Sequence, residues 1–218
     1  MADPVHTAFA DRAVRRDGDR ELPLGPKAER TRENILAAAA ALFGELGYQH
    51  TTVADVADAA GVSLGTVYQY FRDRTDLVAA LVHRSVGTLL ERDTTFRYAD
   101  GLAGLERVIG NFVTSYAAWS TMAGVWEEVS HIDEDLAELR RRLGRIFTET
   151  VERELRRAAL AGKLDAALDP ALTARALTGM VDRYCYVTYV FDPPSSGPPS
   201  PVESATVLSR LWAGAIGL

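Results

Sequence analysis

Residues 51–77 read TTVADVADAAGVSLGTVYQYFRDRTDL, and this stretch decides the fold. Thr52 and Asp55 have the spacing of a helix-capping box, so a short helix begins here. Gly61 provides a tight turn, because glycine adopts a positive φ without strain, and Ser63 is a good N-cap for a second helix. Two short helices joined by a glycine turn are typical of a helix-turn-helix, whose second helix reads DNA.

Helical periodicity extends on both sides of this stretch. Apolar residues repeat at helical spacing before Gly47, which is a good C-terminal stop, and Asp73 and Asp76 cap a helix that runs to about Leu90. Later patterns predict further helices at 102–119, around 125–130, and at 136–160, 170–191 and 202–216, with a short break at Met122–Gly124. The sequence therefore predicts an all-α protein of about nine helices.

The stretch Tyr184–Phe191 could also be a strand, because it is rich in β-branched and aromatic residues. No helix breaker separates it from the helix before it, and the chain offers no partner strand. We therefore interpret it as the buried end of the same helix.

Composition limits the classes of function. The chain has 218 residues, 47% of them hydrophobic, and a net charge of −6. Residues 27–84 contain 6 Lys or Arg against 7 Asp or Glu, a net charge of −1, so any DNA-binding surface must be a local patch. The single cysteine, Cys185, excludes an intrachain disulfide and a multi-cysteine zinc site. An apolar leader is not evident, so we expect a cytoplasmic protein that does not contact a membrane.

The chain divides into three parts by composition. Residues 1–26 mix arginine with acidic residues and lack periodicity, so we expect a disordered arm, with contact to DNA phosphates as the alternative. Residues 27–88 form the helix-turn-helix domain, and residues 89–218 form a second helical domain. Glu127, Glu128 and His131 have a spacing that could hold a metal, but a solvated helix end explains them better. We expect no cofactor, metal or catalytic group.

Residues from about Arg30 to Val82 resemble the TetR family of bacterial one-component regulators. The resemblance is carried by many positions together: Ile35, Leu36, Leu42, Phe43, Gly47, Tyr48, Thr51, Thr52, Val53, Ala57, Ala60, Gly61, Val62, Ser63, Gly65, Thr66, Val67, Tyr68, Tyr70, Phe71, Arg74 and Leu77. It implies a homodimer in which an N-terminal helix-turn-helix binds operator DNA and a C-terminal helical domain binds a ligand and dimerises.

The expected DNA contacts lie at helix starts and on the outer face of the second helix of the motif. They are Thr52, Ser63, Leu64, Gly65, Thr66, Tyr68, Gln69, Tyr70 and Arg74. Hydroxyls and backbone N–H groups suit phosphates, and Gln69 can pair with adenine. Arg74 stands where the family usually has lysine, and Leu64 stands where it often has a basic residue.

The second domain is expected to hold the ligand pocket and the dimer interface. Large apolar side chains that could line a pocket are Phe112, Tyr116, Trp119, Met122, Trp126, Phe147, Met180 and Tyr184. A close-packed core is the alternative for each of them. Interface candidates on the last two helices are Tyr186, Tyr189, Val190, Leu208, Leu211 and Trp212, with an intrachain core as the alternative.

These features favour a ligand-responsive transcriptional repressor that a small apolar or aromatic effector releases from its operator. The mechanism would be a shift between two conformations of the helix from Asp73 to about Leu90. An activator or a corepressor-dependent regulator fits the same sequence. An all-helical enzyme that uses the second domain's cavity is the other alternative, but no nucleophile–base pair supports it.

Overall fold

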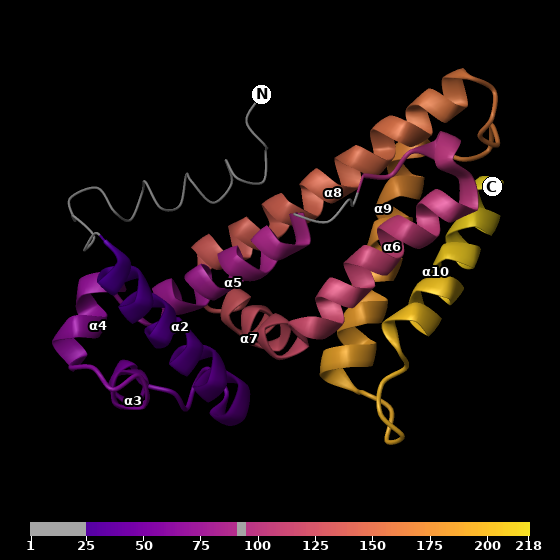
Figure 1. Ribbon diagram of the computed structural model, residues 1–218. Coiled ribbons are helices and arrows are strands. Elements are labelled where there is room, and N and C mark those ends of the chain that lie inside the picture. Colours follow the sequence, from indigo (N-terminus) through magenta and orange to yellow (C-terminus); the bar gives the residue numbers. More distant parts are fainter. Residues whose placement is uncertain (1–24, 91–94) are drawn as a thin grey trace. The chain divides into compact units, whose positions relative to one another are not determined.

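The computed structural model describes residues 25–90 and 95–218. Within them the chain forms nine α-helices and no strand, which confirms the all-α prediction (Figure 1). The α-helices are α2 (Pro26–Leu46), α3 (Val53–Ala59), α4 (Leu64–Tyr70), α5 (Arg74–Leu90), α6 (Gly101–Ala118), α7 (Ser120–Ser130), α8 (Glu134–Leu160), α9 (Pro170–Tyr186) and α10 (Pro201–Ile216). Two short elements complete the order: a 3-10 helix η1 (Tyr98–Asp100) and a π-helix η2 (Val187–Phe191). The expected disordered arm comprises residues 1–26, and residues 1–24 of it lie outside the described residues.

The helix ends follow local sequence signals. Gly47 ends α2 with a φ of 80°, a conformation that favours glycine. The Oδ1 atom of Asp73 accepts a hydrogen bond from the backbone N–H of Asp76 at 2.8 Å, and Asp169 caps α9 in the same way through Leu172 at 2.8 Å. These predicted helix boundaries are confirmed. None of the described helices is long and apolar enough to cross a membrane.

The described chain divides into two compact units. The first holds the described residues up to Ser85 together with Thr121–Arg140, and the second holds Val86–Ser120 together with Arg141–Leu218. Helix α7 and the start of α8 therefore belong to the same unit as the helix-turn-helix. The boundary expected after residue 88 divides the chain differently, because sequence periodicity does not show which helices pack together.

The first unit has a core built on the apolar face of α2. Ile35 and Phe43 of α2, Val56 of α3 and Val67 of α4 are all at most 1% exposed. Helix α7 also packs on α2, at Gly44. A Cβ atom at Gly44 would lie 2.7 Å from the Cγ2 atom of Thr121, so the absence of a side chain there lets the two helices approach closely.

The second unit contains α6 and α10 as an antiparallel pair, which Figure 1 shows side by side. The hydroxyl of Tyr98, just before α6, donates to the carbonyl of Ile216 at the end of α10, at 2.9 Å. Further along, a Cβ at Gly110 would lie 3.9 Å from that of Ala205. A small residue on each helix lets the backbones approach.

The structure changes two expectations about helix continuity. The break expected at Met122–Gly124 is wrong: the chain breaks at Trp119, between α6 and α7. Gly124 stays helical because the neighbouring Met122 and Ala123 are buried, and tertiary packing overrides the low helix propensity of glycine. Tyr184–Phe191 is helical as predicted, but its last five residues widen into the π-helix η2, and Phe191 is 68% exposed.

Candidate nucleic-acid interface

The start of α3 is fixed by a complete capping box. The hydroxyl of Thr52 donates to Asp55 Oδ2 at 2.6 Å, and the backbone N–H of Asp55 donates back to the Thr52 hydroxyl at 3.1 Å. The backbone N–H of Thr52 also donates to Asp55 Oδ2, at 2.8 Å. The bonds from the Thr52 hydroxyl and backbone N–H stabilise the carboxylate and lower the pKa of the Asp55 carboxyl below its ordinary value. The Thr52 hydroxyl proton is thus directed to Asp55, and a phosphate contact at this position remains a prediction.

The turn between α3 and α4 has the expected geometry. Gly61 has a φ of 66°, and the backbone N–H of Val62 donates to the carbonyl of Ala57 at 3.0 Å. Ser63 caps α4, because its hydroxyl accepts from the backbone N–H of Thr66 at 3.1 Å. The two hydroxyls are also hydrogen-bonded, at 2.8 Å, so the Thr66 hydroxyl already has a partner within the protein.

Helix α4 buries one face and exposes the other. Val67 is fully buried and the following Phe71 is 4% exposed, as predicted. The exposed positions of α4 are Leu64, Gly65, Tyr68 and Gln69. Their spacing places them on one side of the helix. Leu64 and Tyr68 are 42% and 40% exposed, while Thr66 and Tyr70 are half-buried.

The structure gives Arg74 partners that the sequence did not suggest. Its Nη1 atom donates to the carbonyl oxygens of Tyr48 at 2.9 Å and Thr51 at 2.8 Å, with a longer bond to Gln49 at 3.4 Å. The guanidinium also lies over the Tyr48 ring, 4.5 Å from its centroid. The structure therefore gives Arg74 partners within the first unit, and a DNA contact at this position remains a prediction.

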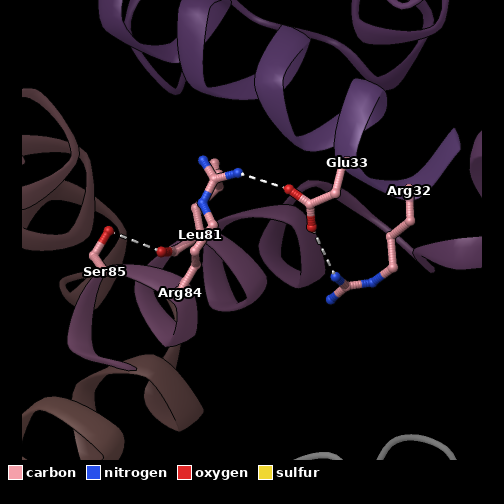
Figure 2. A network of polar contacts seen from close by, with 5 residues as sticks. All are labelled: Arg32, Glu33, Leu81, Arg84 and Ser85. Atoms are coloured by element: carbon pink, nitrogen blue, oxygen red, sulfur yellow. Dashed lines mark hydrogen bonds and ion pairs between the residues drawn. The ribbon is translucent and has the colours of Figure 1, made fainter. Parts of the chain in front are cut away.

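Other basic side chains of this unit are paired as well. Figure 2 shows Glu33 of α2 between two arginines: Arg84 Nη1 lies 3.2 Å and Arg32 Nη1 lies 3.5 Å from its carboxylate oxygens. Arg32 also lies 5.7 Å from the centre of the Phe71 ring. Next to Arg84 in α5, the Ser85 hydroxyl donates to the carbonyl of Leu81 at 3.0 Å. The Glu33–Arg84 pair connects α2 to α5.

The candidate pocket residues do not all lie in one unit. Phe112, Tyr116, Trp119 and Phe147 form a chain of ring contacts in the second unit, with centroids 5.9–6.2 Å apart. Met180 and Tyr184 are half-buried residues of α9 in the same unit, whereas Met122 and Trp126 are buried residues of the first unit. An open hollow of about 750 Å³ lies at residues 159–170, and none of the eight candidates lines it. The pocket remains a prediction.

The interface candidates fall into two groups. Leu208 and Trp212 are 2% and 5% exposed, so they are core residues of the protomer, and the Trp212 ring lies 6.0 Å from that of Phe96. Leu211 is 57% exposed and points away from this core. Tyr186, Tyr189 and Val190 are half-buried. The spacing of apolar residues in the sequence picked out both faces of α10. It did not show which of the two faces packs inward.

Two contributors to this region had no structural role assigned to them from the sequence. Tyr48 is 5% exposed, and its hydroxyl is hydrogen-bonded to that of Thr75 at 3.2 Å. Its spacing from Thr75 carries no signal, because the two are 27 residues apart. Gly44 could have been found, since an isolated glycine inside a helical pattern often has a packing reason.

Comparison with known proteins identifies the same region. A sequence model described as "Bacterial regulatory proteins, tetR family" matches residues 35–81, from α2 to the first half of α5. The transcriptional repressor KstR2 of Mycobacterium tuberculosis H37Rv is 36% identical over 88 residues, which are 40% of this chain and 43% of KstR2. This match thus covers less than half of that protein.

Two longer matches extend into the second unit. The transcriptional regulator AcrR of Shigella flexneri is 25% identical over 182 residues, covering 76% of this chain and 83% of AcrR. The crystal structure of MexZ, described as a key repressor responsible for antibiotic resistance in Pseudomonas aeruginosa, is 28% identical. It covers 86% of this chain and 94% of MexZ, with a TM-score of 0.68. A capped helix-turn-helix, the matching sequence model and these relatives agree: residues 35–81 of this chain are similar to the bacterial regulatory proteins of the tetR family.

Proposed function

We propose that this protein is a DNA-binding transcriptional repressor that a small apolar or aromatic effector releases from its operator. The observation that carries the proposal is the outer face of α4, where Leu64, Gly65, Tyr68 and Gln69 are exposed on a helix whose start is capped. A single helix of this kind fits the major groove, and residues near its N-terminal end reach base edges. KstR2 and MexZ are both named as repressors, which supports this direction of control.

Operator binding by one small helix-turn-helix is weak, so we propose a homodimer acting in the bacterial cytoplasm. Helix α10 carries an exposed stripe at helical spacing: Val207, Leu211 and Gly214. This stripe is a better candidate for the dimer contact than the buried Leu208 and Trp212, because it can lose solvent-exposed apolar surface on association. Twofold symmetry would then separate the two recognition helices by about 34–36 Å, one turn of DNA.

The experiment starts from selection of genomic DNA fragments by the purified protein, followed by titration of the selected duplex. Tyr68→Ala should weaken binding by about tenfold or more, since a base-facing side chain contributes on the order of 1–3 kcal/mol. Leu160→Ala is the control, because Leu160 is 90% exposed on α8 in the other unit. Equal affinity of Tyr68→Ala and the unchanged protein would contradict the assignment of α4.

The effector is tested on the same duplex. Apolar and aromatic compounds that raise the melting temperature of the protein should also release it from DNA, because a ligand that binds one conformation better shifts the population towards it. A compound that tightens DNA binding would instead identify a corepressor-dependent regulator. Turnover of a stabilising compound would support the enzyme alternative.

A further inference from the structure

The guanidinium of Arg74 lies at the junction of three helices of the first unit. It starts α5, stacks on the Tyr48 ring at 4.5 Å, and hydrogen-bonds the chain between α2 and α3. We propose that Arg74 is a positioning residue for DNA binding: it fixes the turn that precedes α3, and it does not contact a DNA phosphate. This inference rests on the proposed function, and it concerns how the DNA-binding surface is held.

The geometry of Arg74 is suited to holding backbone. The carbonyls of Tyr48, Gln49 and Thr51 all receive bonds from one nitrogen, Nη1. Such carbonyls carry partial negative charge after a helix end, and a charged donor strengthens the bonds to them. The guanidinium carbon lies over the Tyr48 ring, 4.5 Å from its centroid, which adds a cation–π contact that a lysine ammonium matches less well.

Tyr48 anchors this arrangement in the core. It is 5% exposed, its ring lies 5.7 Å from that of Phe43 in α2, and its hydroxyl is hydrogen-bonded to Thr75 in α5. The guanidinium of Arg74 therefore stacks on a side chain that α2 and α5 both hold. Movement of Arg74 away from this place, towards DNA, would break the stacking contact and the bonds to the carbonyls together.

The contact at Thr51 links Arg74 to the DNA-binding surface. Thr51 is fully buried, and its hydroxyl donates to the carbonyls of Gly47 at 2.9 Å and Leu42 at 3.3 Å. The next residue, Thr52, caps α3, and α4 follows through the turn at Gly61. By fixing the carbonyl of Thr51, Arg74 sets where α3 begins relative to α5.

A phosphate contact and a backbone clamp make different demands on the side chain. A phosphate contact needs the positive charge and releases a counterion, so it contributes about −0.9 to the slope of log K against log salt. A lysine satisfies that demand. The clamp needs the reach and the flat face of arginine, and it contributes nothing to the slope.

The experiment measures affinity for the selected duplex across a salt series for Arg74→Lys, Arg74→Ala and Arg72→Ala. Arg72 is an exposed arginine just before the start of α5, so its removal controls for loss of one charge near the DNA. We expect Arg74→Lys and Arg74→Ala both to lose about tenfold in affinity. The salt slopes of Arg74→Lys and Arg74→Ala should both equal that of the unchanged protein, because the clamp contributes nothing to the slope.

A second measurement does not depend on DNA. Hydrogen exchange at residues 49–56 of the free protein should be faster in both Arg74 variants than in Arg72→Ala, because the turn loses its clamp. Unaltered affinity and exchange in Arg74→Lys, or a slope that falls by about 0.9 per protomer in Arg74→Ala relative to the unchanged protein, would overturn the proposal. Failure of the unchanged protein to select any DNA would instead contradict the proposed function, and the exchange result would still decide the role of Arg74.

Discussion

The contact between Gly44 of α2 and Thr121 of α7 leads to a prediction whose sign depends on the packing. Replacement of a glycine by alanine inside a helix ordinarily stabilises a protein by about 0.5–1 kcal/mol, because glycine loses more backbone entropy on folding. At Gly44 the added Cβ would lie 2.7 Å from the Cγ2 atom of Thr121. Carbon atoms pack best at about 3.5–4.0 Å, so one of the two groups must move by roughly 0.8 Å or more.

Overpacking of this kind costs about 1–3 kcal/mol. When the gain in helix propensity is subtracted from this cost, Gly44→Ala is expected to lower the free energy of unfolding by about 1 kcal/mol. Urea denaturation followed by circular dichroism measures the change in the free energy of unfolding. In the Thr121→Ser background the Cγ2 methyl is absent, so the same Gly44→Ala change should stabilise the protein by about 0.5–1 kcal/mol.

The double-mutant cycle supplies the control, since Thr121→Ser alone reports the cost of losing the methyl. A Gly44→Ala change that stabilises the protein equally in both backgrounds would refute the reasoning, because it would mean that α7 does not pack closely on α2.

Three further predictions concern other parts of the chain. Thr52→Ala should lower the urea midpoint, and it should also reduce the loss of stability on acidification. The hydrogen bonds from Thr52 lower the pKa of the Asp55 carboxyl below 3.8, so their contribution is present above that pH and is lost as the pH falls through the folded-state pKa. The thiol of Cys185 should react with a disulfide reagent at pH 8 only after denaturation, because burial raises its pKa to about 12; rapid reaction of the native protein would contradict its burial. Leu211→Glu should convert the proposed dimer to a monomer in sedimentation at micromolar concentration while Leu160→Glu does not, and a Leu211→Glu dimer would place the interface elsewhere.

The sequence predicted those features that depend on neighbouring residues. The capping box of Thr52 and Asp55, the cap at Ser63 and the turn at Gly61 are local, and each has a known spacing. The inward direction of Val67 followed from helical periodicity in the same way. One such signal was overlooked: Ser200 and Glu203 form a second capping box, at the start of α10, with the same spacing as the first.

The remaining features depend on residues far apart in the chain. Arg74 meets carbonyls 23–26 positions away, and Glu33 meets Arg84 across 51 positions, distances at which no periodicity operates. Leu208 and Leu211 of α10 are equally apolar, and only the packed fold shows that one is buried and the other exposed. The role of a side chain depends on partners that are distant in the sequence. The positions of the helices were therefore easier to predict than the contacts that their residues make.

The interleaving of the two units has a consequence for how such proteins can be recombined. The chain passes between the units within α5, after the first residue of α7, and within α8. A gene fusion that exchanges only the first 88 residues would therefore place a foreign α2 against the resident α7. Functional chimaeras of this protein should be those in which the side chain at position 121 of one parent packs against the residue at position 44 of the other. Exchange of residues 121–140 together with the N-terminal segment should restore folding to the others.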